Sequence, residues 1–369
     1  MTVCLSALGA ILPRPGWAQL ADLRLGVAAY QGQTIKHSPK MVFDLPSPAR
    51  ALSVEVSWQS DGRHPWHAWH GYPRLGWTAG MLDYGHREVL GRAYGFFPHM
   101  DLPLLRRSRG QLYVRLGYGL AWLDKTYDPQ TNPINNAIGS HLNNFTQLGL
   151  VGDICLVGPW VLQTGLCFAH NSNARLQVPN LGLNTAAVRL GLQYRVTAPG
   201  EGLSYRRTQP VDRPLRRWGG FVRVGLAAAE AKVANGPKYP VYIVMLGGDY
   251  AWRAKGRVLA GLEYSQDWGI AHFYLNQDIP PRQGNRSAGR YALYGGHEFL
   301  FGRMGIQTLG FLYLNDPLGN TPAWGLKLGP MLYLRPSHAA TRFNAFAGIY
   351  LKSHLFDADF AELTIGLRM

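Results

Sequence analysis

Apolar residues alternate with polar or small residues along most of the chain, in segments of about ten residues. In 111–123, QLYVRLGYGLAWL, one face carries Leu112, Val114, Leu116, Tyr118, Leu120 and Trp122, and the other carries Tyr113, Arg115, Gly117, Gly119 and Ala121. A side-chain period of two is typical of β-strands. The segments 186–195 and 361–369 show the same division. The pattern therefore predicts strands with one apolar face and one face of glycine and polar residues.

About sixteen such segments can be counted, and together they predict an all-β protein. They lie near 23–31, 48–58, 73–83, 91–100, 111–123, 143–157, 160–170, 184–196, 219–229, 241–252, 256–265, 288–300, 303–314, 324–334, 341–351 and 358–369. Strands of this length with an apolar outer face, a polar inner face and Trp or Tyr at their ends are typical of transmembrane antiparallel β-barrels. Because no apolar run reaches about 18 residues, transmembrane helices are excluded.

The polar, Pro- and Arg-rich stretch 197–217 divides these segments into two halves of eight. We therefore expect a barrel half at 19–196, a linker or long loop at 197–217 and a second barrel half at 218–369. The halves can form one sixteen-stranded barrel or two tandem eight-stranded barrels. A single large barrel is the commoner solution for one chain, so it is slightly preferred here.

The first residues predict export. The short apolar stretch CLSALGAIL at 4–12 is followed by Gly16-Trp17-Ala18, with small residues where a signal peptidase cleaves. We expect 1–18 to be a signal peptide and the mature chain to reach the outer membrane of a Gram-negative bacterium. A buried first strand is the alternative interpretation.

Composition adds the nature of the partner. Only 16% of the residues are charged, 44 are Gly, and Lys plus Arg exceed Asp plus Glu by 15. Such an excess predicts an anionic partner. Nucleic acid is not expected for an exported barrel, whereas the phosphates of lipopolysaccharide account for the same charge.

The densest polar cluster at a strand end is 170–184, HNSNARLQVPNLGLN. Alternation along the preceding strand places His170 and Ser172 on its apolar, outward face, and Asn184 lies on the same face of the next strand. Ser172 could act as a nucleophile with His170 as its base. The alternative is a hydrated strand end without chemistry.

These residues resemble the signature of the lipid A 3-O-deacylase family, the PagL-like acyloxyacyl hydrolases of outer membranes. The matching motif is His170-Asn171-Ser172-Asn173, followed by Pro179-Asn180-Leu181-Gly182 and then Asn184. The resemblance covers roughly 23–196 and includes IKHSP at 35–39 and NNAIGSHLNN at 135–144.

The resemblance implies a serine esterase that removes acyl chains from lipid A or lipopolysaccharide. We expect no metal or other cofactor. Ser172 matches the nucleophile and His170 the general base; Asn180 and the backbone N–H of Arg175 match oxyanion donors, with Asn173 in support. The family's acidic residue falls on Asn184, and Arg175 replaces a small residue. Reduced activity or a pseudoenzyme therefore stays open.

Two other motifs predict less. His64, His67 and His70 suggest a metal site, but on a strand a spacing of three places neighbouring members on opposite faces, and Trp66 and Trp69 suit an interfacial girdle better. Ser353-His354, followed by Asp357 and Asp359, resembles a vestige of the first cluster. The second hypothesis for the whole chain is a non-catalytic barrel, either a pore or a structural envelope component.

Overall fold

The computed structural model describes residues 21–196, 216–230, 234, 236–275, 284, 288–315, 322–336, 341–354 and 357–369. The expected signal peptide and most of the expected linker lie outside these residues. All sixteen predicted strands are present, with ends that differ from the expected ones by a few residues. The strands are β1 (Ala21–Ile35), β2 (Ala49–Gln59), β3 (Arg74–Asp83), β4 (Arg92–Arg107), β5 (Gly110–Leu123), β6 (Leu142–Cys155), β7 (Trp160–Ser172), β8 (Leu183–Arg195), β9 (Trp218–Glu230), β10 (Lys238–Arg253), β11 (Gly256–Asp267), β12 (Gly289–Phe301), β13 (Met304–Tyr313), β14 (Trp324–Tyr333), β15 (Asn344–His354) and β16 (Asp357–Arg368).

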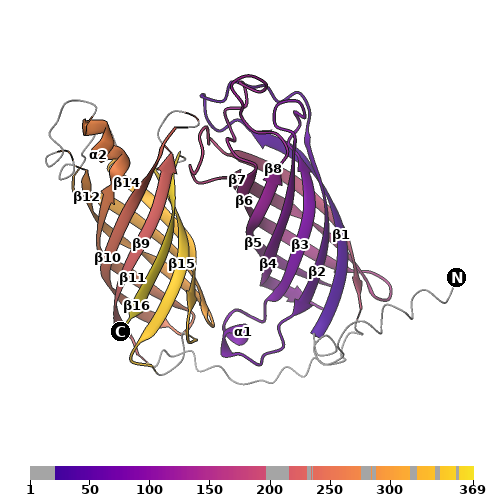
Figure 1. The fold of residues 1–369 in the computed structure, drawn as a ribbon. Coiled ribbons are helices and arrows are strands. Elements are labelled where there is room, and N and C mark those ends of the chain that lie inside the picture. The colour runs from indigo at the N-terminus through magenta and orange to yellow at the C-terminus, as the bar shows by residue number, and fades with distance from the viewer. Residues whose placement is uncertain are drawn as a thin grey trace, which may run out of the picture.

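The strands form two closed antiparallel barrels of eight strands each, which stand side by side (Figure 1). The slight preference for one large barrel is therefore wrong. β8 pairs back onto β1, with Val27 opposite Leu192, and β16 pairs onto β9, with Ile365 opposite Val224. Each set of eight strands thus satisfies its own edges, which leaves no open edge for a joint sheet.

The predicted faces of the strands are confirmed. Outward side chains such as Leu25, Val27 and Leu166 are more than half exposed, while the inward Arg115 and Arg189 are completely buried. On the described strands, six tryptophans are exposed, namely Trp77, Trp122, Trp160, Trp218, Trp252 and Trp324. An apolar outer wall is suited to a lipid bilayer. Closure of each barrel also lets neighbouring strands satisfy one another's backbone polar groups, which lipid cannot do.

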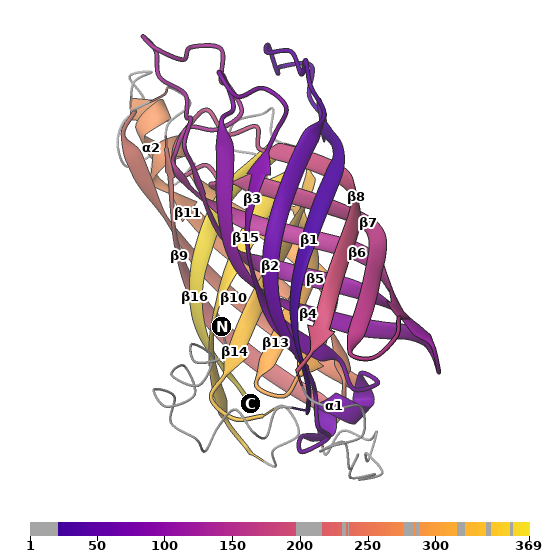
Figure 2. The same cartoon turned by 90° about the vertical axis from the view of Figure 1, so that its right-hand side faces the viewer.

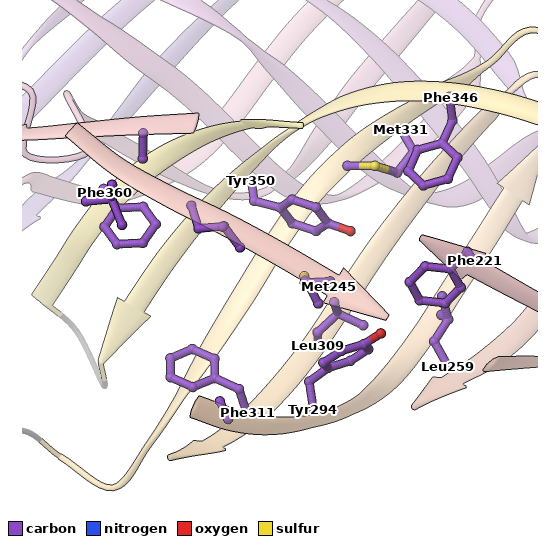
Figure 3. Packing of buried hydrophobic residues seen from close by; sticks show 14 of the residues in the cluster. Phe221, Met245, Leu259, Tyr294, Leu309, Phe311, Met331, Phe346, Tyr350 and Phe360 are labelled. Carbon is purple, nitrogen blue, oxygen red and sulfur yellow. The ribbon is translucent and has the colours of Figure 1, made fainter. Parts of the chain in front are cut away.

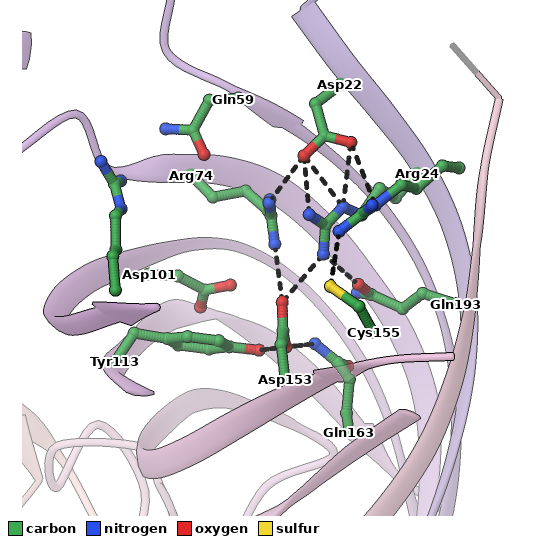
Figure 4. A network of polar contacts seen from close by, with 12 residues as sticks. Asp22, Arg24, Gln59, Arg74, Asp101, Tyr113, Asp153, Cys155, Gln163 and Gln193 are labelled. Carbon is green, nitrogen blue, oxygen red and sulfur yellow. Dashed lines mark hydrogen bonds and ion pairs between the residues drawn. The ribbon is translucent and has the colours of Figure 1, made fainter. Parts of the chain in front are cut away.

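Buried charges form a network inside the first barrel, near the starts of β1 and β3 and the end of β6 (Figure 4). Arg24 and Arg74 both contact Asp153, at 2.8 and 3.1 Å. One layer further in, Arg115 bonds Glu55 at 2.6 Å and Asp101 at 2.7 Å. An apolar cluster closes the other end of the barrel, with Phe43, Tyr84, Leu90, Phe97, Leu123, Ile138, Phe145 and Leu183 among its members.

Aromatic and apolar side chains fill the second barrel (Figure 3). Phe221, Met245, Tyr294, Phe311 and Tyr350 are among the members of this cluster. Lys327 lies between Glu263 and Glu362, at 2.6 Å from each. Side chains thus occupy the centres of both barrels, as expected for barrels of eight strands.

The connections differ in length at the two ends of the first barrel (Figure 2). We call the end with 36–48, 84–91, 124–141 and 173–182 the loop end, and the opposite end, where β6 and β7 are joined by a short turn, the turn end. In outer-membrane barrels, short turns are periplasmic and long loops are extracellular. We therefore expect the loop end to lie on the extracellular side.

Two short helices were not predicted from the sequence. α1 (Pro65–Trp69) lies in the 60–73 connection at the turn end, and α2 (Trp268–Leu275) directly follows β11 in the second barrel. Neither of these described helices has the length and apolarity needed to cross a membrane. His70, at the end of α1, donates from Nε2 to the carbonyl of Leu300 at 2.8 Å and stacks on the Phe301 ring. α1 thus links the first barrel to the β12–β13 turn of the second.

Candidate active site

The pairing of three neighbouring strands places the cluster from the sequence at the loop end of the first barrel. His170 on β7 lies directly opposite Asn184 on β8, and Ser172 lies opposite Asn144 on β6. The side chains of His170 and Ser172 continue the outward face of Leu166 and Phe168, because the inward positions are taken by Cys167 and Asn171. The site is therefore built on the lipid-facing wall.

A chain of hydrogen bonds joins the three side chains. Asn184 Oδ1 lies 2.6 Å from His170 Nδ1, and His170 Nε2 lies 3.0 Å from Ser172 Oγ. An amide oxygen only accepts, so Nδ1 carries the proton and Nε2 presents its lone pair to the serine hydroxyl. This tautomer is the one that a general base for Ser172 requires.

The segment 173–182 folds over Ser172, whose side chain is only 2% exposed. The chain reverses at Ala174 and Arg175, whose φ angles of +53° and +61° are uncommon for residues with a Cβ. Asn173 donates its backbone N–H to Asn180 Oδ1 at 2.9 Å. The Asn180 amide is therefore held beside the residue that follows Ser172.

The other atom of the Asn180 amide is free to donate. Asn180 Nδ2 is buried and has no hydrogen-bond partner among the described residues. A buried N–H without an acceptor is costly, and a ligand oxygen at this position would satisfy it. An anionic oxygen beside Ser172 would supply that acceptor.

Gly182 permits the segment to pass close to His170. Its φ of +77° favours glycine, and a Cβ at this position would lie 3.0 Å from His170 Cε1. The Gly182 N–H donates to the carbonyl of Ala137 at 3.0 Å. A side chain here would push against the imidazole ring.

Two supporting residues received no role from the sequence. Asn144 Oδ1 accepts the backbone N–H of Ser172 at 3.2 Å, and Ser140 Oγ accepts from Asn173 Nδ2 at 2.8 Å. Both belong to the segment 135–144, whose resemblance to the family was the available signal. Asn173, predicted to support the site, also donates from Nδ2 to the Gln177 carbonyl at 2.9 Å.

The Arg175 side chain points away from Ser172, and Ser353 and His354 in the second barrel are arranged differently from Ser172 and His170. The Arg175 guanidinium extends toward the second barrel and lies 3.7 Å from Asp359. In the second barrel, His354 points inward against Phe311 and Tyr313, while Ser353 is the next residue on the opposite face of β15. Ser353 and His354 therefore do not form a pair like that of Ser172 and His170.

The three histidines near α1 lie on a helix and its flanks, not on a strand as the argument from their spacing assumed. His67 Nδ1 accepts the Gly62 N–H at 3.1 Å, and burial together with neighbouring His64 lowers the pKa of His67 to about 4. Among the described residues, no group of three or more His, Cys, Asp or Glu side chains could hold a metal ion. The His67 ring thus has a structural contact.

Comparison with solved structures gives partial likenesses. The crystal structure of the outer membrane enzyme PagL aligns with 45% of this chain and 97% of its own, at 19% identity and a TM-score of 0.33. Neisserial surface protein A aligns with 47% of this chain and 97% of its own, at 9% identity and a TM-score of 0.30. At these identities the likeness concerns the fold alone. A search of curated proteins gives no match.

Family models match both halves of the chain. The model described as lipid A 3-O-deacylase (PagL) matches residues 52–193, which include His170, Ser172 and Asn184. The model described as acyloxyacyl hydrolase, C-terminal domain, matches residues 218–369. The chain therefore belongs to the PagL-like family, with 52–193 matching the PagL model and 218–369 matching the C-terminal domain model.

Proposed function

We propose that this protein is an outer-membrane serine esterase that hydrolyses acyl ester bonds of lipid A. The observation that carries the proposal is the hydrogen-bonded chain from Asn184 through His170 to Ser172 on the lipid-facing wall. Acyl chains of lipid A lie in the outer leaflet, so a nucleophile on this wall and near the loop end meets its substrate without extracting it from the membrane.

The geometry supports two steps of acyl transfer. In the first, Ser172 Oγ attacks the ester carbonyl and His170 Nε2 takes the hydroxyl proton, which passes to the departing sugar alcohol. The acyl group remains on Ser172. In the second, His170 takes a proton from water, the resulting hydroxide attacks the acyl-serine, and Ser172 leaves with its proton restored. Atoms and charge balance, and the products are a fatty acid and the sugar alcohol.

The tetrahedral intermediates carry a negative oxygen that needs donors. Asn180 Nδ2 is the buried donor held beside the nucleophile, and the Arg175 backbone N–H lies in the same segment. Preorganised donors of this kind often contribute the largest single electrostatic effect in acyl transfer, with about 10²–10³ in rate lost when one is removed.

The chemistry needs no metal or cofactor, and none enters the proposal. We further propose that 1–18 direct export and that the excess of cationic residues suits the phosphates of lipopolysaccharide. The alternative of an open pore is disfavoured, because buried ion pairs and apolar clusters occupy the described interior of each barrel. A pseudoenzyme is favoured by the amide at Asn184 and by Arg175 in place of a small residue.

Acyl release by the purified protein tests the proposal. Incubated in detergent with lipopolysaccharide, the wild type should release fatty acid and yield lipid A lighter by one acyl chain in the mass spectrum. Ser172→Ala should release none. Ser353→Ala is the matched control, because Ser353 lies on the outward face of β15 without a paired histidine, and it should retain full activity. Release that persists in Ser172→Ala would contradict the proposal.

A further inference from the structure

Glu230, the last residue of β9, is a carboxylate at an outward position of the second barrel. Along β9 the inward side chains are Phe221, Arg223 and Ala227, so Glu230 shares the outer face of Val224 and Leu226. Val224 and Leu226 are about half exposed, yet Glu230 is only 3% exposed. A charge on the outer wall needs a compensating contact, because burial without hydrogen bonds is costly.

The segment over Ser172 provides that contact. Val178 donates its backbone N–H to Glu230 Oε2, and the backbone N–H of Glu230 donates to the Arg175 carbonyl at 3.2 Å. Arg175 also lies 3.7 Å from Asp359, at the start of β16. The second barrel therefore contacts the outer part of the segment by both its backbone and its side chains.

The contact with the second barrel lies next to the part of the segment whose backbone conformation is least favourable. Ala174 and Arg175 both adopt left-handed φ angles, which are costly for residues other than glycine and persist only where the surrounding structure enforces them. Hydrogen bonds attach the two ends of the segment to the first barrel, from Asn173 Nδ2 to Ser140 Oγ and from the Gly182 N–H to the carbonyl of Ala137. Between these ends, the bonds to Glu230 attach the strained turn to a rigid strand end.

We propose that Glu230 is a positioning residue through which the C-terminal barrel holds the segment 173–182 in its catalytic geometry. The inference rests on the proposed function, since its consequence is the placement of Asn180 and of the Arg175 backbone beside Ser172. It assigns a role to the C-terminal barrel, which carries no serine–histidine pair of its own among the described residues.

Two kinds of variant test this role in the full-length protein. Glu230→Ala removes the acceptor, and Glu230→Leu removes it with a side chain suited to a lipid-facing wall, so that folding is preserved. Glu230→Gln keeps an oxygen acceptor and serves as the conservative variant. Asp249→Asn is the matched control, because Asp249 pairs with Arg368 and Arg257 and touches no part of the segment.

Hydrogen exchange and kinetics are measured on the same samples in lipid nanodiscs, with the folded amount determined by electrophoretic mobility. In the Ala and Leu variants, the amides of 173–178 should exchange about tenfold faster, as loss of a hydrogen bond to a charged group predicts. The kcat per folded molecule should fall about tenfold or more while KM changes little. Glu230→Gln should resemble the wild type, and Asp249→Asn should leave the exchange of 173–178 and the kcat per folded molecule unchanged.

Three results would overturn the inference. If exchange in 173–178 is unchanged in the Ala and Leu variants, Glu230 does not hold the segment. If kcat is unchanged, the contact has no role in catalysis. If exchange is faster throughout the second barrel, Glu230 is a general stabiliser of that barrel. If the wild type releases no fatty acid, the proposed function fails separately, and the exchange data still decide whether Glu230 holds the segment.

Discussion

Asn184 orients the His170 ring but brings no negative charge to it. Its Oδ1 lies 2.6 Å from Nδ1, which fixes the tautomer with Nε2 facing Ser172. When a serine reaction proceeds, the imidazole becomes an imidazolium, and a neutral amide stabilises that cation less than a carboxylate does. The Asn184 amide therefore orients the His170 ring, but it stabilises the imidazolium less than a carboxylate would.

Asn184→Asp should raise kcat by about tenfold to a hundredfold, a fraction of the effect of losing a triad acid, since the tautomer is already correct. KM should stay nearly unchanged because the substitution does not touch the substrate. Steady-state acyl release measures both values. Asn184→Leu, which removes the acceptor at similar size, is the matched control and should lower kcat. A kcat that Asn184→Asp leaves unchanged would contradict the role given to the pair.

The residues of the cluster could be predicted from the sequence because strand alternation fixes faces. His170, Ser172 and Asn184 share the outward face of neighbouring strands, and a period of two suffices to place them there. The fold of 173–182 could not be predicted, because Ala174 and Arg175 take backbone conformations that their residue types disfavour. The anchor at Glu230 depends on a contact between two barrels, which no local pattern encodes.

At the scale of the strands, paired charges stabilise the interior of each barrel. Arg115 on β5 is completely buried and bonds Glu55 on β2 and Asp101 on β4. The sequence shows these residues only as isolated polar positions among glycines. Their pairing across the barrel requires that the sheet close, so it follows from the topology and not from any one strand.

Arg115→Met should lower the free energy of unfolding by about 3–5 kcal/mol, because it leaves buried carboxylates with one cation fewer. Urea unfolding in lipid vesicles, followed by tryptophan fluorescence, measures the change. Arg87→Met is the control: Arg87 is 68% exposed where it pairs with Asp83, so its loss should cost no more than about 1 kcal/mol. Equal losses in the two variants would contradict the account of the interior.

At the scale of the whole molecule, two filled barrels carry one assembled site. The number of strands and their faces could be predicted, but one barrel or two could not, because alternation along a strand does not say which strands close the sheet. The pairing of β1 with β8 and of β9 with β16 decides the question. Contacts of α1 with the β12–β13 turn and of 175–178 with Glu230 then join the barrels at both ends.

In the folded protein, Ser172 should be an activated serine. Treatment of the folded protein with an alkyl phosphonate that reacts with activated serines, followed by mass spectrometry of the whole chain and its peptides, tests it most directly. We expect a single adduct, on Ser172, that is lost in His170→Ala. Absence of an adduct on the folded wild type, or an adduct that persists in Ser172→Ala, would contradict it.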